Sequence, residues 1–140
     1  MGCTEDSVAV RREKLVRVVL ADDHAAFRES LREMLSLDGG IEVVGEAGNG
    51  LEALEVVEGA RPDVVVLDLA MPLMGGEEAA RLVLGEASPP PRVVILTMRK
   101  DPHLGRELLK NGASAFLAKS ASLAEIVAAV KDARPNLPQG

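Results

Sequence analysis

Aromatic residues, cysteine and long apolar runs are all scarce in this chain. Trp and Tyr are absent, and Phe27 and Phe116 are the only aromatic residues, which makes each a candidate for a specific role. The single cysteine, Cys3, excludes an intramolecular disulfide and a zinc site built on cysteines. No apolar run reaches the roughly 20 residues that span a membrane, and no signal-peptide pattern is present. We therefore expect a cytoplasmic protein that makes no use of a membrane.

The charge balance of the chain is acidic. Asp and Glu number 22 against 16 Lys and Arg, which gives a net charge of −6. This argues against the segment itself gripping the phosphate backbone of a nucleic acid. The proportions of apolar residues, 47%, and charged residues, 27%, are ordinary for a soluble globular protein. A length of 140 residues suits one domain with a sizeable core.

Five short apolar runs alternate with helical patterns along the chain. The runs predict strands at 17–21, 41–47, 64–68, 93–97 and 115–118. Between them, apolar residues recur at helical spacing, as at Phe27, Leu31 and Leu35. Asn49 and Ser122 each precede a helical segment and are followed three positions later by Glu, the pattern of a helix N-cap. Five such units predict an α/β fold, a parallel sheet with helices on both faces.

The two ends of the chain lack this alternation. Residues 1–15 carry mixed charge with little periodicity, which predicts a flexible N-terminal extension. Residues 134–140 contain Pro, Asn, Gln and Gly, which is typical of the start of a linker. We therefore expect one domain over residues 16–133.

Acidic residues stand at the carboxyl ends of two predicted strands, where an α/β sheet usually holds its ligand. Asp22 and Asp23 follow the first strand, and Asp68 ends the third. Three carboxylates at one edge are unfavourable because each opposes the ionisation of the others. A hard divalent cation among them removes that conflict, and Mg²⁺ prefers oxygen ligands. A strand-to-helix cap is the alternative role for Asp22 and Asp23.

A hydroxyl and an amine complete this edge of the sheet. Thr97 ends the fourth strand and Lys119 follows the fifth. A carboxylate such as Asp68 can attack phosphorus to form an acyl phosphate, while lysine and threonine contact the phosphoryl oxygens. The sequence therefore predicts phosphoryl transfer at this edge. The alternatives are an ordinary β-branched strand residue at Thr97 and a solvated charge at Lys119. His24 lies beside the acids, but without a second His or Cys it fits an exposed loop residue better than a metal ligand.

This set of residues, in this order, resembles the receiver domain of two-component response regulators over residues 16–133. Several local motifs are similar to the NarL/FixJ subfamily, which usually carries a LuxR-type helix-turn-helix output domain after the receiver. They are Asp22-Asp23-His24, Glu46-Ala47-Gly48-Asn49-Gly50, Leu96-Thr97-Met98 and Gly112-Ala113-Ser114. The resemblance implies a flavodoxin-like (βα)5 fold, a doubly wound sheet of five parallel strands.

The resemblance also implies a role for each site residue. Asp68 would accept a phosphoryl group from the phosphohistidine of a sensor histidine kinase, with Thr97 and Lys119 contacting that group as the rest of the catalytic set. Asp68, Asp23 and the backbone carbonyl of Ala70 would bind Mg²⁺ directly.

Asp22 would act on the same Mg²⁺ through water. Thr97 and Phe116 would form the switch that reports phosphorylation to the surface, although Phe116 can equally be a core residue.

The function implied is a signalling switch, and not an enzyme acting on an external substrate. The domain would catalyse only its own Mg²⁺-dependent phosphorylation and dephosphorylation. We expect homodimer formation on phosphorylation, and contact with DNA only through an output domain outside these residues. Two rivals remain. An aspartate-nucleophile phosphohydrolase would need an acid at position 70, which is alanine. A pseudo-receiver that is never phosphorylated would not need the acids, Thr97 and Lys119.

Overall fold

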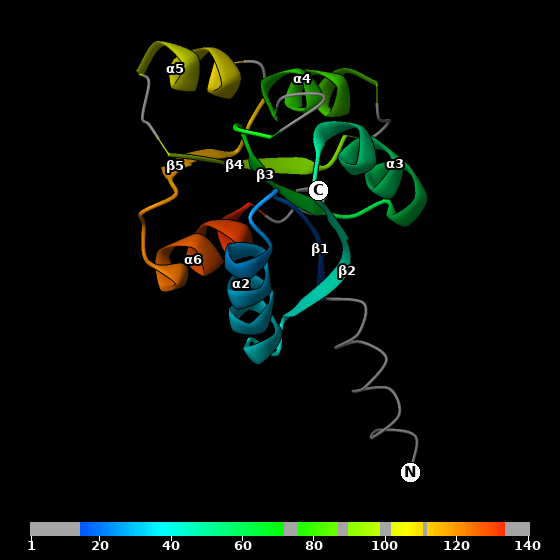
Figure 1. Ribbon diagram of the computed structural model, residues 1–140, viewed down its shortest axis with the longest axis vertical. Coiled ribbons are helices and arrows are strands. Elements are labelled where there is room, and N and C mark those ends of the chain that lie inside the picture. The colour runs from blue at the N-terminus through cyan, green and yellow to red at the C-terminus, as the bar shows by residue number, and fades with distance from the viewer. Residues whose placement is uncertain (1–14, 72–75, 87–89, 99–101, 111, 134–140) are drawn as a thin grey trace, which may run out of the picture.

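The strands form a single parallel sheet in the order β2-β1-β3-β4-β5 (Figure 1). The computed structural model describes residues 15–71, 76–86, 90–98, 102–110 and 112–133, so the predicted linker and all of the predicted extension except Leu15 lie outside the described residues. The strands are β1 (Val16–Ala21), β2 (Ile41–Ala47), β3 (Val64–Asp68), β4 (Arg92–Thr97) and β5 (Ala115–Ala118). All five predicted strands are present, and β1 and β4 begin one residue earlier than predicted.

Helices cover both faces of the sheet. They are α2 (Ala25–Leu37), α3 (Gly50–Ala60), α4 (Gly76–Glu86), α5 (Pro102–Lys110) and α6 (Leu123–Asp132). In Figure 1, α2 and α6 lie on one side of the sheet, and α3, α4 and α5 lie on the other. The predicted doubly wound α/β architecture is therefore confirmed.

The core consists of two layers separated by the sheet. All five residues of β3 are buried, and their side chains alternate between the layers, as the period of a strand requires. Val65 and Leu67 pack with apolar residues of α3, α4 and α5, whereas Val64 and Val66 pack with those of α2 and α6. Burial of each such side chain contributes about 1.5–3 kcal/mol. The central strands are apolar throughout because both of their faces are covered.

Two of the helices begin at the predicted caps. The side chain of Asn49 accepts a hydrogen bond from the Glu52 N–H at 2.8 Å at the start of α3. The Ser122 hydroxyl accepts one from the Glu125 N–H at 3.1 Å at the start of α6. Each bond satisfies one of the free N–H groups of a first helical turn.

The order of the strands places the ends of β1 and β3 side by side. The chain runs from β1 outward to β2 and then returns to β3 on the other side of β1, so the direction of winding reverses there. Ala21, the last residue of β1, pairs with Leu67. Such a reversal point opens a crevice at the carboxyl ends of the strands, where α/β proteins bind their ligands.

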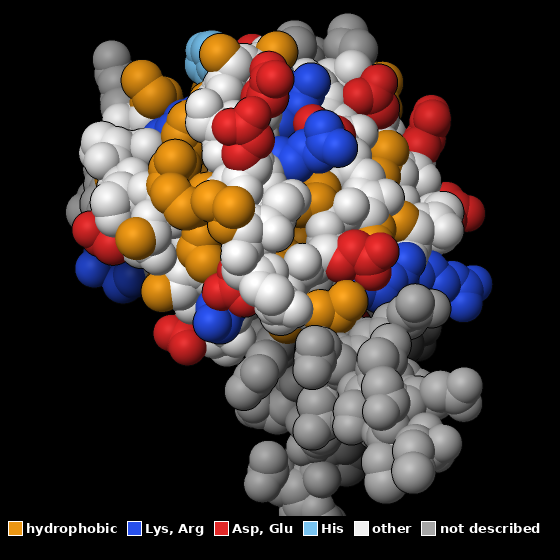
Figure 2. Space-filling view, turned by 90° about the horizontal axis from the view of Figure 1, so that it is seen from below, with side chains coloured by type: hydrophobic (Ala, Val, Ile, Leu, Met, Phe, Trp, Pro, Cys, Tyr) orange, Lys and Arg blue, Asp and Glu red, His pale blue; other side chains and the backbone are white. Residues whose placement is uncertain are grey.

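The surface carries charges of both signs. Figure 2 shows acidic and basic side chains interspersed on the face seen from below, where neither sign forms a continuous area. This face therefore lacks the basic stripe that a nucleic-acid-binding surface presents. Among the described residues, no helix combines the length and the apolar character needed to cross a membrane.

Candidate functional site

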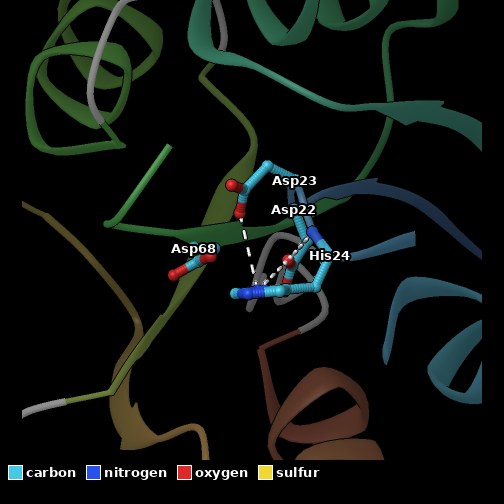
Figure 3. A group of neighbouring side chains, drawn as sticks. All are labelled: Asp22, Asp23, His24 and Asp68. Carbon is cyan, nitrogen blue, oxygen red and sulfur yellow. Dashed lines mark hydrogen bonds and ion pairs between the residues drawn. The ribbon is translucent and has the colours of Figure 1, made fainter. Parts of the chain in front are cut away.

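Three acids meet at the reversal point between β1 and β3. Asp22 follows β1 and Asp68 ends β3, and they are only 4% and 1% exposed. Asp23 is the next residue along the chain. Each of these three carboxylates and the neighbouring His24 offers one atom that could bind a metal ion, and these four atoms all lie within 4.8 Å of one another (Figure 3). The structure thus brings together the three acids that the sequence placed at this edge.

Lys119 lies among these acids and is itself buried. Its ammonium nitrogen donates hydrogen bonds to Asp22 Oδ1 at 2.9 Å and to Asp68 Oδ2 at 3.2 Å, and it lies 2.8 Å from His24 Nδ1. The ammonium group is thus enclosed by two carboxylates and an imidazole ring. The alternative that Lys119 is a solvated charge is therefore wrong.

The sequence analysis did not predict that His24 and Phe27 lie beside Lys119. His24 is 59% exposed, as predicted for a loop residue, yet its Nδ1 atom faces the ammonium group. Phe27 packs against the layer under α2 and α6, and its ring centroid lies 4.7 Å from Lys119 Nζ. That distance allows a cation–π attraction. The sequence indicated this proximity only in that His24 and Phe27 follow Asp22 and Asp23 within one helical turn.

The start of α2 excludes a simple capping role for the acids. The N-cap residue is His24, and its side chain forms no capping hydrogen bond. Asp22 instead turns toward the sheet edge, where its Oδ1 accepts a hydrogen bond from the His24 N–H at 2.8 Å. Asp22 thus shapes the turn into α2 and also binds Lys119, so a capping role alone does not account for it.

Burial sets the electrostatics of Asp68. Loss of water raises the pKa of its carboxyl group above the ordinary value, and the nearby charge of Asp22 raises it further. The N–H of Ala70, which donates to Asp68 Oδ1 at 3.1 Å, and the ammonium group of Lys119 act in the opposite direction. Lys119 therefore offsets only part of the cost of the charge on Asp68, and a metal cation beside Asp68 would stabilise that charge further.

One oxygen of the site lacks a hydrogen bond. Asp22 Oδ2 is buried and forms an ion pair with Lys119 Nζ at 2.8 Å, but it accepts no hydrogen bond of adequate geometry from the described residues. Lys119 therefore balances the charge of this oxygen, but the hydrogen-bonding capacity of the oxygen is not used among the described residues. Together with the other two carboxylates, this oxygen fits a hard divalent cation, which takes oxygen ligands and retains water.

The remaining predicted site residues lie at the same edge. Thr97 is buried at the end of β4, one position beyond the residue that pairs with Asp68, and its carbonyl accepts the Lys119 N–H at 2.6 Å. Ala70 is exposed just after β3. Phe116 of β5 is half-buried against the layer under α3, α4 and α5, where its ring lies 3.1 Å from the place that a Cβ atom at Gly105 of α5 would take.

Comparison with known proteins identifies the family of this chain. Residues 18–131 match the family model of the response regulator receiver domain. The probable transcriptional regulatory protein NarL of Mycobacterium tuberculosis is 43% identical over 117 residues, which cover 84% of this chain and 54% of that protein. The chain therefore belongs to the response regulator receiver domain family.

Solved structures agree with this assignment. The signal receiver domain of NarL from Mycobacterium tuberculosis superimposes with a TM-score of 0.79 at 42% identity, covering 85% of this chain and 95% of that one. A LuxR-family two-component response regulator from Aurantimonas sp. gives a TM-score of 0.76 at 33% identity, covering 89% and 91%. The chain spans about half the length of the curated relatives it matches.

Proposed function

We propose that this domain is a phosphorylation-controlled switch in which Asp68 accepts a phosphoryl group from the phosphohistidine of a sensor histidine kinase. The observation that carries the proposal is the surrounding of Asp68. Its carboxylate is buried at the end of β3, contacts the Lys119 ammonium group at 3.2 Å and shares a 4.8 Å cluster with two further acids. Membership of the receiver family supports the same role.

The proposed transfer uses the carboxylate as the nucleophile. One oxygen of Asp68 forms a bond to phosphorus while the bond from phosphorus to the imidazole nitrogen of the donor breaks, and the imidazole leaves with its electron pair. Lys119 exchanges a carboxylate partner for a phosphoryl oxygen, and the Thr97 hydroxyl donates a hydrogen bond to a second phosphoryl oxygen. Water later hydrolyses the acyl phosphate, which restores the free carboxylate. The domain acts only on itself in this cycle.

Mg²⁺ would neutralise the charge that builds up on the phosphoryl oxygens. Asp23, Asp68 and the backbone carbonyl of Ala70 would hold it directly, and Asp22 would hold it through water. The cluster of three acids supports this choice, because carboxylate oxygens and water are the ligands that Mg²⁺ prefers.

The proposed output is a change of surface on the side of β4 and β5. When Thr97 moves toward the phosphoryl group, Phe116 gains room to turn inward, which is a shift between two packings of the same residues. The relatives named above are regulators of transcription or belong to the LuxR family, so we propose a DNA-binding output domain outside residues 16–133 and homodimer formation on phosphorylation. The segment from residue 134 onward would begin the linker.

Labelling by a small phosphoryl donor tests the proposal. The chain is incubated with phosphoramidate in Mg²⁺ or in EDTA, and phosphorylation is followed by intact mass. Wild type should gain one phosphoryl group in Mg²⁺ and none in EDTA, and Asp68→Asn should gain none in either. Asp132→Asn, an exposed acid on α6, is the matched control and should label like wild type. Mg²⁺-dependent labelling of Asp68→Asn would rule out the assignment.

A further inference from the structure

Arg28 connects the acidic loop after β1 with Glu46 of β2, and the proposed function uses neither Arg28 nor Glu46. It lies on α2 and is 22% exposed. Its Nε atom donates a hydrogen bond to Glu46 Oε1 at 2.9 Å, and its terminal NH1 group donates one to the backbone carbonyl of Asp22 at 2.5 Å. The guanidinium group therefore bridges β2 and the acidic loop through two of its donors, a geometry that its planar fork favours.

The position of the Asp22 carbonyl matters for the metal site. The Asp22 N–H donates to the carbonyl of Ala47 in β2 at 2.9 Å, so the backbone of this residue is fixed on its amino side by the sheet. On its carboxyl side the chain has left β1, and Arg28 supplies the hydrogen bond that a neighbouring strand would otherwise supply. The carbonyl belongs to the peptide plane that joins Asp22 to Asp23. Its orientation therefore sets the direction in which both carboxylates project.

We infer that Arg28, oriented by Glu46, is a positioning residue for the metal-binding acids Asp22 and Asp23. The inference rests on the proposed function and extends it to residues that touch neither metal nor phosphoryl group. Glu46 lies in β2, where its backbone pairs with Leu20 of β1. Its carboxylate therefore holds the Arg28 guanidinium group in a fixed position relative to the sheet and the acidic loop. Groups that orient metal ligands in this way affect metal affinity about 10- to 100-fold.

Charge alone predicts the opposite effect on metal binding. A guanidinium group bound to the backbone of the acidic loop repels a divalent cation held there, so its removal would strengthen Mg²⁺ binding if charge alone decided the affinity. Positioning predicts weaker binding after removal. The sign of the change in affinity therefore separates the two explanations.

Arg32 provides a matched control. It lies one turn further along α2, pairs with the other oxygen of Glu46 at 3.4 Å and is 57% exposed. In the described part of the chain, it makes no hydrogen bond to Asp22. Removing it changes the net charge by the same amount and also deprives Glu46 of an ion pair. The two arginines share their charge and their Glu46 partner, whereas Arg28 is the more buried and alone of the two contacts the acidic loop.

Isothermal titration of the full chain with MgCl₂ tests the inference. Arg28→Ala should weaken Mg²⁺ binding about tenfold, whereas Arg32→Ala should stay within about twofold of wild type, as expected for an exposed pair. Equal affinities of the two variants, or tighter binding by Arg28→Ala, would overturn the inference. Circular dichroism without metal checks that each variant folds.

Arg28→Lys keeps the test decisive where the alanine variant does not fold. Lysine retains the charge but cannot hold Glu46 and the Asp22 carbonyl at once. We expect its Mg²⁺ affinity to fall toward that of Arg28→Ala, and an affinity equal to wild type would contradict positioning. A wild-type chain that binds no Mg²⁺ would instead count against the proposed function, so the two failures are distinguishable.

Discussion

Replacing Lys119 by methionine removes the one cation that the structure shows between two buried carboxylates. Methionine keeps an unbranched side chain of similar length, so the change is mainly the loss of the ammonium charge, which also faces the Phe27 ring. Without the ammonium group, Asp22 and Asp68 face each other unpaired. We therefore expect the metal-free domain to be strongly destabilised, and we expect Mg²⁺ to restore much of the lost stability.

The distances give the scale of this effect. With an effective dielectric constant of about 20, the ion pairs at 2.8 and 3.2 Å are attractive by about 6 and 5 kcal/mol before desolvation is subtracted. The carboxylate oxygens lie no more than 4.8 Å apart, so their repulsion is about 3.5 kcal/mol or more. Breaking a buried pair by removing one partner costs about 3–5 kcal/mol in measured cases. We expect a loss in that range, which lowers the Tm by about 10–20 °C.

Thermal and urea unfolding in EDTA and in saturating Mg²⁺ measure the loss. The difference between Lys119→Met and wild type should be about 3–5 kcal/mol in EDTA and clearly smaller in Mg²⁺. Lys131→Met is the control, because Lys131 pairs with Asp38 at 3.0 Å on the surface and should contribute less than about 1 kcal/mol. A loss below about 1 kcal/mol for Lys119→Met, or one that Mg²⁺ leaves unchanged, would refute the reasoning.

Three other positions give equally specific expectations. Burial raises the pKa of Asp68, so its favourable contribution to folding is complete below its ordinary value of 3.8 and is lost as the pH rises through its pKa in the folded protein. Asp68→Asn should therefore melt above wild type at pH 7 without metal, and the difference should vanish toward pH 4; a lower Tm at pH 7 would contradict this. A Cβ atom at Gly105 would lie 3.1 Å from the Phe116 ring, so Gly105→Ala should displace that ring and shift its aromatic NMR signals. Gly59→Ala, which meets no neighbour, should leave those signals unchanged and add about 0.5–1 kcal/mol of stability. Ser122→Ala removes the cap of α6 and should cost about 1 kcal/mol in urea unfolding, and an unchanged midpoint would argue against the cap.

The sheet and the acid cluster could be predicted because both follow from local pattern. Apolar runs of strand length mark the strands, and carboxyl ends of parallel strands meet at one edge, which brings Asp22 and Asp68 together without any knowledge of side-chain conformations. The caps at Asn49 and Ser122 are equally local, since the accepting side chain and the N–H donor are three residues apart.

Contacts that depend on how α2 lies against the sheet could not be predicted. Arg28 and Glu46 are 18 residues apart, and their hydrogen bond exists only because α2 crosses close to β2. The contact between His24 and Lys119 joins residues 95 apart and depends on the rotamers of two flexible side chains. Residue patterns carry no information about these choices, which packing decides.

The residue that carries the phosphoryl group is the most direct test of the central claim. The full chain is phosphorylated with phosphoramidate in Mg²⁺, the acyl phosphate is reduced with borohydride, and the modified residue is located by peptide mass spectrometry. The buried carboxylate at the end of β3 predicts modification at Asp68 alone. A phosphoryl group found on His24 or on a hydroxyl such as Thr97, with Asp68 unmodified, would contradict it.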